Sequence, residues 1–118
     1  MKYMLLLHSN PADGPSPDSP DFAEDMQRWF AYTNALTQAG AYVSGDALHG
    51  TETATTVRVR NGSRVVTDGP FIESKEALGG YYIIDVADLD AAIDWAARIP
   101  NVTFGTVEVR PLMVLPDA

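Results

Sequence analysis

The chain has 118 residues and a formal net charge of −8, from eight Lys and Arg residues against sixteen Asp and Glu residues, and it contains no cysteine. This length predicts a single domain over residues 1–118, which can bury its own core without a disulfide or a structural metal. The lack of thiols excludes disulfides, iron–sulfur clusters, Cys-ligated zinc and a Cys nucleophile, and the acidic balance with scattered basic residues argues against direct binding of nucleic acid.

A short apolar run opens the chain between Lys2 and His8, and its length predicts a buried strand. The run is far shorter than the roughly 20 apolar residues that a membrane span requires, and it lacks the features of a signal peptide. We therefore expect a cytoplasmic protein without a membrane partner. The following segment, Asn10 to Pro20, contains four prolines and is predicted to be an irregular loop.

A helix is predicted next, beginning at Ser19-Pro20-Asp21, where a hydroxyl can cap the first turn and proline is favoured at the first helical position. Its apolar residues recur at helical spacing and form one stripe, which comprises Phe22, Met26, Trp29, Phe30, Thr33, Leu36 and Thr37. Trp29 and Phe30 are expected to lie in the core. Gly40 is predicted to end the helix as a left-handed cap, and a second strand is expected from Ala41 to Leu48.

A hairpin is the clearest local signal in the chain. Alternating β-branched residues from Thr53 to Arg60 and from Ser63 to Asp68 flank the pair Asn61-Gly62, which favours a two-residue turn of type I′. A further strand, rich in aromatic and β-branched residues, is expected from Gly79 to Val86.

A second helix is predicted between a capping Asp88 and the helix-stopping Pro100. Its inner face is expected to comprise Leu89, Ala92, Ile93, Ala96 and Ala97. The last strand is expected from Thr106 to Val114. Without the hairpin, the order of elements predicts a ferredoxin-like α+β sheet of βαββαβ order, with both helices on one face and the hairpin as an insertion. The other face of the sheet would carry no helices, so a homodimer is expected.

The segment from Thr67 to Tyr82, which reads TDGPFIESKEALGGYY, resembles the signature of the DGPF-type branch of the YCII-related proteins. The likeness covers nearly the whole chain. It includes the opening Met-Lys-Tyr-Met-Leu-Leu, the run ATTVRVR, and the segments Ile84-Asp85-Val86, Trp95-Ala96-Ala97 and Val107-Glu108-Val109-Arg110-Pro111.

This resemblance implies a ferredoxin-like fold of the dimeric α/β-barrel type. It further implies acid–base chemistry on small organic molecules through a His–Asp pair, as suggested for the wider YCII-like group, and an association with bacterial sigma-factor systems. The first hypothesis is a cofactor-independent enzyme of the lyase or isomerase type that binds a small organic molecule in a pocket at the end of the sheet. The second is a non-enzymatic sensor or accessory module linked to sigma-factor-dependent transcription.

The predicted topology brings several segments to one end of the sheet. We expect His8, His49, the segment from Asp68 to Leu78 and the loop before Thr106 to converge there and to form a pocket. Asp68 and His8 are the catalytic candidates, because histidine titrates near neutrality and a carboxylate can act as a base or orient a histidine. Both also have a structural interpretation, as a turn carboxylate before a Gly-Pro pair and as a hydrogen-bonded histidine at a strand end.

The candidate ligand-binding residues are Glu73, Lys75, Glu76, Arg58 and His49. Lys75 or Arg58 can neutralise an acidic ligand, and Glu73 can share a proton with Asp68 if both are partly buried. The alternative for these charged residues is a solvated surface or cross-strand ion pairs, as for Glu108 and Arg110 on the last strand. Two histidines far apart in sequence and the lack of a glycine-rich phosphate loop predict neither a metal site nor a nucleotide cofactor.

Overall fold

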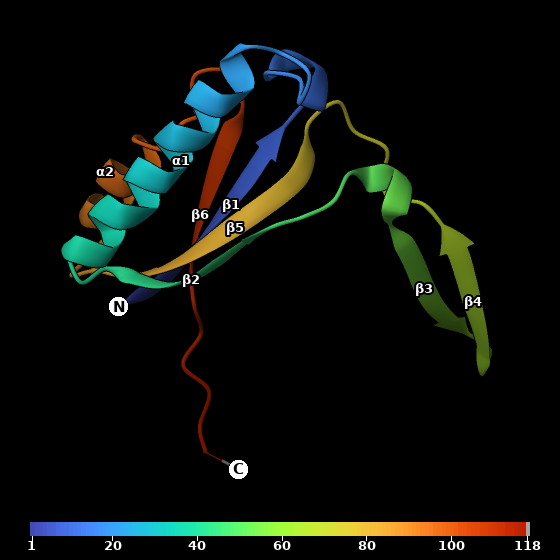
Figure 1. Ribbon diagram of the computed structural model, residues 1–118. Helices are drawn as coiled ribbons and strands as arrows, with labels where there is room; N and C mark the ends of the chain where they lie inside the picture. Colours follow the sequence, from blue (N-terminus) through green and yellow to red (C-terminus); the bar gives the residue numbers. More distant parts are fainter. Residues whose placement is uncertain (118) are drawn as a thin grey trace.

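The computed structural model describes residues 1–117 (Figure 1), so Ala118, the last residue of the predicted domain, lies outside the described residues. The order of elements confirms the predicted helices, strands and inserted hairpin, with ends that differ by a few residues. In chain order the elements are β1 (Lys2–Ser9), the 3-10 helix η1 (Pro11–Asp13), α1 (Asp21–Gln38), β2 (Tyr42–Ala47), the 3-10 helix η2 (Thr51–Thr53), β3 (Thr55–Arg60), β4 (Ser63–Asp68), β5 (Ala77–Asp85), α2 (Leu89–Ala96) and β6 (Thr106–Pro111).

The main sheet has four strands in the order β2-β5-β1-β6, and each neighbouring pair in it is antiparallel. β1 and β2 therefore run parallel to each other, and the chain leaves both strands at the same end of the sheet. Figure 1 shows α1 and α2 against one face of this sheet. The ferredoxin-like α+β fold with both helices on one face is thus confirmed.

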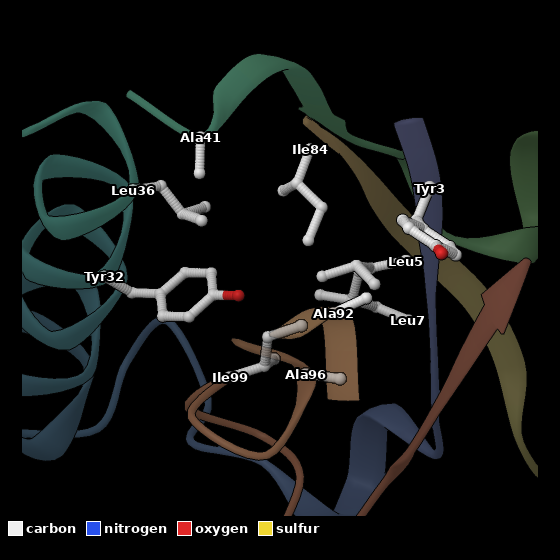
Figure 2. Packing of buried hydrophobic residues seen from close by; sticks show 10 residues of the cluster. All are labelled: Tyr3, Leu5, Leu7, Tyr32, Leu36, Ala41, Ile84, Ala92, Ala96 and Ile99. Atoms are coloured by element: carbon white, nitrogen blue, oxygen red, sulfur yellow. The ribbon is translucent and has the colours of Figure 1, made fainter. Parts of the chain in front are cut away.

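The core lies between the helices and this face of the sheet (Figure 2). Strand alternation in β1 turns Tyr3, Leu5 and Leu7 toward the helices, and all three are buried. The other buried members of the cluster are Tyr32, Leu36, Ala41, Ile84, Ala92, Ala96 and Ile99. Full burial of one large aliphatic side chain stabilises a fold by about 1.5–3 kcal/mol, so this cluster holds both helices on the sheet.

The apolar stripe of α1 is wider than the surface that packs on the sheet. Trp29 packs against the core as expected, but the expectation for Phe30 is wrong, because this side chain is 67% exposed. At 3.6 residues per turn, Phe30 lies roughly 120° around the helix from the fully buried Leu36, so it projects from the side of α1. In α2, Leu89 and Ile93 are likewise half-exposed, because Ala92 and Ala96 make the contact with the core.

Both helices begin as the sequence predicts. The Ser19 hydroxyl accepts a hydrogen bond from the first N–H of α1 at 3.1 Å, and the Asp88 carboxylate accepts one from the N–H of Ala91 at 2.9 Å. Gly40 has a φ of +72° directly after α1, which confirms the left-handed cap. Neither α1 nor α2 combines the length and the apolar composition that would let a helix cross a membrane.

β3 and β4 form a separate two-stranded sheet, termed the arm (residues 55–68), which stands away from the main sheet in Figure 1. Positive φ angles at Asn61 (+52°) and Gly62 (+76°) confirm the predicted type I′ turn. The chain leaves and rejoins the main sheet at one place, where the N–H of Leu48 donates to the carbonyl of Gly79 at 2.9 Å. Apart from the half-buried Thr56, every residue of both arm strands is exposed.

The second face of the main sheet is covered by no helix of residues 1–117, and we term it the uncovered face. The strand register places the partly buried side chains of Met4, Leu6 and Ile83 on it. The same register adds the exposed charged residues Glu108 and Arg110. This face therefore combines an apolar centre with charged side chains.

Candidate functional site

A cavity of about 980 Å³ lies at the end of the main sheet where the chain leaves β1 and β2 and enters β5. We term it the sheet-end cavity. Its walls are His8 from β1, residues 48–56 after β2, and residues 69–74 and 76–78 before and within β5. The cavity therefore lies between the main sheet and the base of the arm.

Four of the predicted site residues line this cavity together: His8, His49, Glu73 and Glu76. These residues come from parts of the chain that are far apart in sequence and meet because the parallel strands β1 and β2 end on the same side. Their chemical roles remain predictions.

The other three predicted residues, Asp68, Arg58 and Lys75, do not line the cavity. Asp68 is exposed at the end of β4, opposite Thr55, and Arg58 is exposed in β3, opposite Val65. Within residues 1–117, neither side chain has an ion-pair partner. The expected cross-strand ion pairs of the arm are therefore not formed, and its arginines face solvent.

His8 is held next to a carboxylate. A bulge in the β1–β5 ladder separates Leu7, which is buried on the helix side, from His8, which pairs with Leu78. The imidazole is 28% exposed, and its Nε2 lies 3.4 Å from Oε1 of Glu108 on the neighbouring strand β6. A carboxylate at this position can orient the ring, and an imidazole held in this way is a candidate general acid or base.

Glu108 is a site residue that the sequence reasoning missed, because it was assigned to a surface ion pair on β6. The available signal was the alternation of β6, which places Glu108 on the same face as Thr106. Since Thr106 pairs with His8 in the β1–β6 ladder, Glu108 and His8 had to share that face. The sequence alone does not give the register of two strands that lie about a hundred residues apart.

Glu76 is fixed beside the same strand end. Its two carboxylate oxygens accept hydrogen bonds from the Thr106 hydroxyl, at 3.0 and 3.2 Å, and its backbone carbonyl accepts one from the Ser74 hydroxyl. Because Thr106 pairs directly with His8, the Glu76 carboxylate borders the histidine's end of the sheet. Glu76 is therefore the best anchored of the predicted ligand-binding residues.

The sheet-end cavity is acidic. Glu52, Glu73 and Glu76 line it, and its lining contains no Lys or Arg among the described residues. This charge favours a neutral or cationic molecule over an anionic one. In the part of the chain that the structure describes, no three His, Asp or Glu side chains gather in a way that could hold a metal ion.

A second concave region, which we term the helix-side groove, lies between α1 and the strands β2 and β5 and has a volume of about 660 Å³. Its aromatic lining comprises Trp29, Phe30, Tyr42 and Tyr82. The sequence reasoning missed this groove. Two features of the sequence could have indicated it. The apolar stripe of α1 is wide, and β2 and β5 contain glycines, which have no side chains to fill the space between the sheet and the helix.

Two tyrosine hydroxyls of β5 are hydrogen-bonded and remain protonated at neutral pH. Tyr82 faces the groove, whereas Tyr81, which pairs with Leu6, projects to the uncovered face. Burial raises the pKa of Tyr82, although the Thr33 hydroxyl at 2.7 Å partly opposes this shift. The pKa of Tyr81 is raised mainly because its hydroxyl donates to the Asp46 carboxylate at 2.8 Å. The groove thus presents neutral aromatic surfaces.

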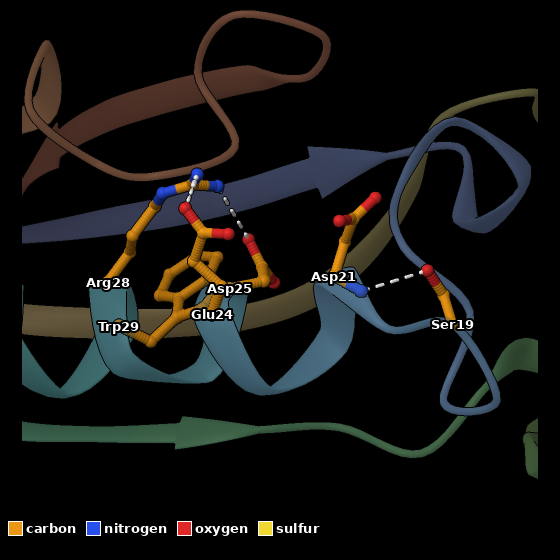
Figure 3. A network of polar contacts seen from close by, with 6 residues as sticks. All are labelled: Ser19, Asp21, Glu24, Asp25, Arg28 and Trp29. Carbon is orange, nitrogen blue, oxygen red and sulfur yellow. Dashed lines mark hydrogen bonds and ion pairs between the residues drawn. The ribbon is translucent and has the colours of Figure 1, made fainter.

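The first turns of α1 hold one wall of this groove in place (Figure 3). The indole N–H of Trp29 donates to Oδ2 of Asp25 at 3.2 Å. Arg28 in turn forms ion pairs with Glu24 at 3.0 Å and with Asp25 at 4.0 Å. These contacts fix the Trp29 ring on the side of the helix.

Comparison with known proteins identifies a matching family, a protein of similar sequence and a solved structure of similar fold. The family model of the YCII-related domain matches residues 1–116. An uncharacterized protein of Rhizobium meliloti (strain 1021) is 34% identical over 114 residues, which cover 95% of this chain and 92% of that protein. The structure is also similar to 5-chloro-2-hydroxyhydroquinone dehydrochlorinase from Burkholderia phenoliruptrix AC1100, solved in complex with 2,5-dihydroxybenzoquinone. That similarity has a TM-score of 0.52 at 12% identity and covers 96% of this chain and 94% of the other.

Proposed function

Because the chain belongs to the YCII-related domain family, we propose that it binds a small organic molecule in the sheet-end cavity and transfers a proton to or from that molecule. The observation that carries this proposal is the contact of 3.4 Å between Glu108 and His8, the member of the pair that lines the cavity. The proposal needs no cofactor, because histidine and carboxylate side chains are sufficient for proton transfer.

In this mechanism His8 acts as the base. Its neutral imidazole takes a proton from the bound molecule, and the Glu108 carboxylate stabilises the imidazolium that forms. An isomerase returns the proton to another atom of the same molecule, whereas a lyase releases a leaving group from the neighbouring carbon. Both reactions suit a cavity whose lining favours neutral or cationic molecules.

The fold supports this class of chemistry. A protein with a similar fold is named a dehydrochlorinase, and its crystals contain a small hydroxylated quinone. Loss of hydrogen chloride is a lyase-type reaction in which a base removes the proton. The similarity in sequence is low, so the identity of the base in this chain rests on its own geometry.

We further propose that the protein is a homodimer. The uncovered face presents Met4, Leu6 and Ile83, and the arm exposes four valines that contact no other element strongly. An isolated two-stranded hairpin is at best marginally stable in water, so the arm needs a surface to pack on. Arg58, in the middle of β3, would reach a cavity only across such an interface. Asp68 lies at the base of the arm, where its neighbours Thr55 and Gly69 line the sheet-end cavity, so it would act at the edge of that cavity. Lys75 would bind an acidic group at the cavity rim.

The exposed valines of the arm also favour a second candidate function. A sensor or accessory module, acting by protein contacts in sigma-factor-dependent transcription, would use such an apolar surface to bind its partner. In that case substitution of His8 would leave function intact, whereas substitution of the arm valines would abolish it.

Native mass spectrometry of gently purified protein is the first test. We expect a dimer that carries a discrete extra mass, and the corresponding compound then becomes the substrate to assay. A second measurement uses hydroquinone, a small hydroxylated ring that is uncharged at neutral pH, as a probe in an NMR titration. Shifts confined to His8, His49 and residues 69–78 support the sheet-end cavity, whereas shifts confined to Trp29 and Gly45 would move the site to the helix-side groove. An empty protein that does not bind the probe would contradict the proposal.

A further inference from the structure

We propose that the arm of one copy packs on the uncovered face of a second copy, where its Arg64 binds the partner's Glu108. This inference rests on the homodimer and the His8 site of the proposed function. It assigns Arg64 as a positioning residue that each copy receives from the other.

One face of the arm is suited to packing. The ladder pairs Val57 with Val66 and Val59 with Arg64, so these four side chains share a face. The three valines are 58%, 57% and 62% exposed, in the order Val57, Val66 and Val59. The opposite face carries Arg58, Arg60 and Val65. An apolar face that ends in one arginine can pack on the apolar centre of the uncovered face and place its arginine beside Glu108, although Arg110 of the same strand also lies on that face.

The charge of the arm is opposite to that of the rest of the chain. The arm holds three of the eight basic residues and one of the sixteen acidic residues. Within residues 1–117, its three arginines form no ion pair. A basic arm on an acidic protein is attracted to the acidic surface of another copy, which brings the two together in a defined orientation.

The arm cannot make this contact with its own sheet. It stands away from the main sheet in Figure 1, and its strands of six residues extend about 20 Å from its base. Arg64 lies near the tip. In a symmetric dimer each arm reaches the other copy, and the same contact forms twice.

Glu108 is the available carboxylate on the uncovered face. Asp46 on the same face already accepts the Tyr81 hydroxyl at 2.8 Å, and Asp85 pairs with the N-terminal ammonium at 3.2 Å. Glu108 is 51% exposed and has only His8 as a charged partner in the described chain, at 3.4 Å. A guanidinium binds a carboxylate through two hydrogen bonds, so Arg64 and His8 can share Glu108.

The contact links dimer formation to the chemistry of the site. In the dimer, the guanidinium of Arg64 holds the Glu108 carboxylate in place, and this carboxylate in turn orients the His8 ring at 3.4 Å. Each site therefore reaches its working state only when the arm of the second copy is docked.

The test compares Arg64→Gln with Arg60→Gln, a matched control near the same tip but on the opposite face of the arm. Dissociation of the dimer is measured by light scattering after size-exclusion chromatography over a range of concentrations. We expect Arg64→Gln to weaken the dimer at least about 100-fold, because the symmetric dimer loses a charge-assisted hydrogen bond at each of its two contacts, and Arg60→Gln to change it by less than about twofold. Equal effects of the two substitutions would overturn the inference.

Two further measurements identify the partner of Arg64. In a double-mutant cycle, Arg64→Gln should weaken the dimer no further once Glu108→Gln is present, whereas additive effects would count against the pair. Followed by NMR, the chemical shifts of the His8 ring protons should change in Arg64→Gln and stay unchanged in Arg60→Gln. If the unmodified protein is monomeric, both the homodimer and this inference fail. If a dimer forms but Arg64→Gln has no effect, only this inference fails.

Discussion

His8 and Glu108 meet diagonally across β1 and β6, with Nε2 and Oε1 3.4 Å apart. Glu108 pairs in the ladder with Leu6, two residues before His8, so the side chains of both residues leave the sheet on the uncovered face. A slip of one residue in the β1–β6 register would turn Glu108 to the helix side and separate the pair. The site therefore depends on strands from opposite ends of the chain being paired in one register.

The role of His8 predicts a selective loss of turnover. His8→Gln removes the base but keeps a polar side chain, so we expect turnover of the copurified compound to fall at least about 100-fold. The melting temperature should change little, because His8 is not part of the buried cluster. His49→Gln is the control, since His49 lines the same cavity and has no ion-pair partner in residues 1–117. A larger loss in the control would assign the base to His49.

Tyr32 predicts a loss of stability at alkaline pH. Burial raises the pKa of Tyr32 well above its ordinary value near 10, and its hydroxyl donates to the carbonyl of Trp95 at 2.8 Å. Above about pH 10 the unfolded chain loses this proton while the folded chain keeps it, so the free energy of unfolding falls as the pH rises toward the raised value.

Urea denaturation between pH 8 and pH 11 measures this effect. Tyr32→Phe should reduce the alkaline slope. The remaining slope reflects Tyr82, whose pKa is raised by burial, and Tyr81, whose pKa is raised by its hydrogen bond to Asp46. An unchanged slope in Tyr32→Phe would show that this hydroxyl does not control the alkaline transition.

The core predicts a large cost for truncation of Leu36, which is fully buried between α1 and the sheet. Leu36→Ala should lower the free energy of unfolding by about 2–5 kcal/mol, because it removes buried methyl groups and leaves a cavity. The matched control is Leu115→Ala, at a side chain that is 70% exposed, and we expect it to change stability by less than about 0.5 kcal/mol. Similar costs for the two leucines, measured by urea denaturation, would contradict the packing in Figure 2.

Two glycines of the main sheet should respond differently to the same substitution. A Cβ at Gly45 would lie 2.8 Å from the Tyr82 ring, whereas a Cβ at Gly79 would meet its nearest neighbour, the Leu7 carbonyl, at 3.9 Å. Gly45→Ala is therefore expected to destabilise the fold by about 1–3 kcal/mol, through overpacking. Gly79→Ala should cost far less. If thermal denaturation showed a larger loss of stability for Gly79→Ala than for Gly45→Ala, the described packing of the helix-side groove would be wrong.

The fold could be predicted from the sequence because its signals are local and agree with one another. The Asn61-Gly62 turn, the Asp88 cap and the Gly40 cap each depend on neighbouring residues alone. The order of the elements, βαββαβ without the hairpin, then predicted a ferredoxin-like sheet. The prediction that Phe30 is buried was wrong. Helical spacing shows which residues share a stripe, but it does not show how far the contact with the sheet extends around the helix.

The site could be predicted only in part. Connectivity brought His8, His49, Glu73 and Glu76 to one end of the sheet, and that much follows from strand direction. The pairing of His8 with Glu108 follows from strand register, which depends on the packing of the whole core. The position of Asp68 could not be predicted either, because no local sequence pattern shows whether a hairpin projects from the sheet or folds onto it.

The meeting of Leu48 and Gly79 at the root of the arm has an evolutionary consequence. Since the chain departs from and returns to the main sheet at one hydrogen-bonded point, the arm (residues 55–68) can change in length or sequence without altering the strand register of that sheet. We expect the arm to diverge faster among related chains than the sheet does. Copies of one protein would then recognise each other through their arms and exclude the copies of a close relative made in the same cell.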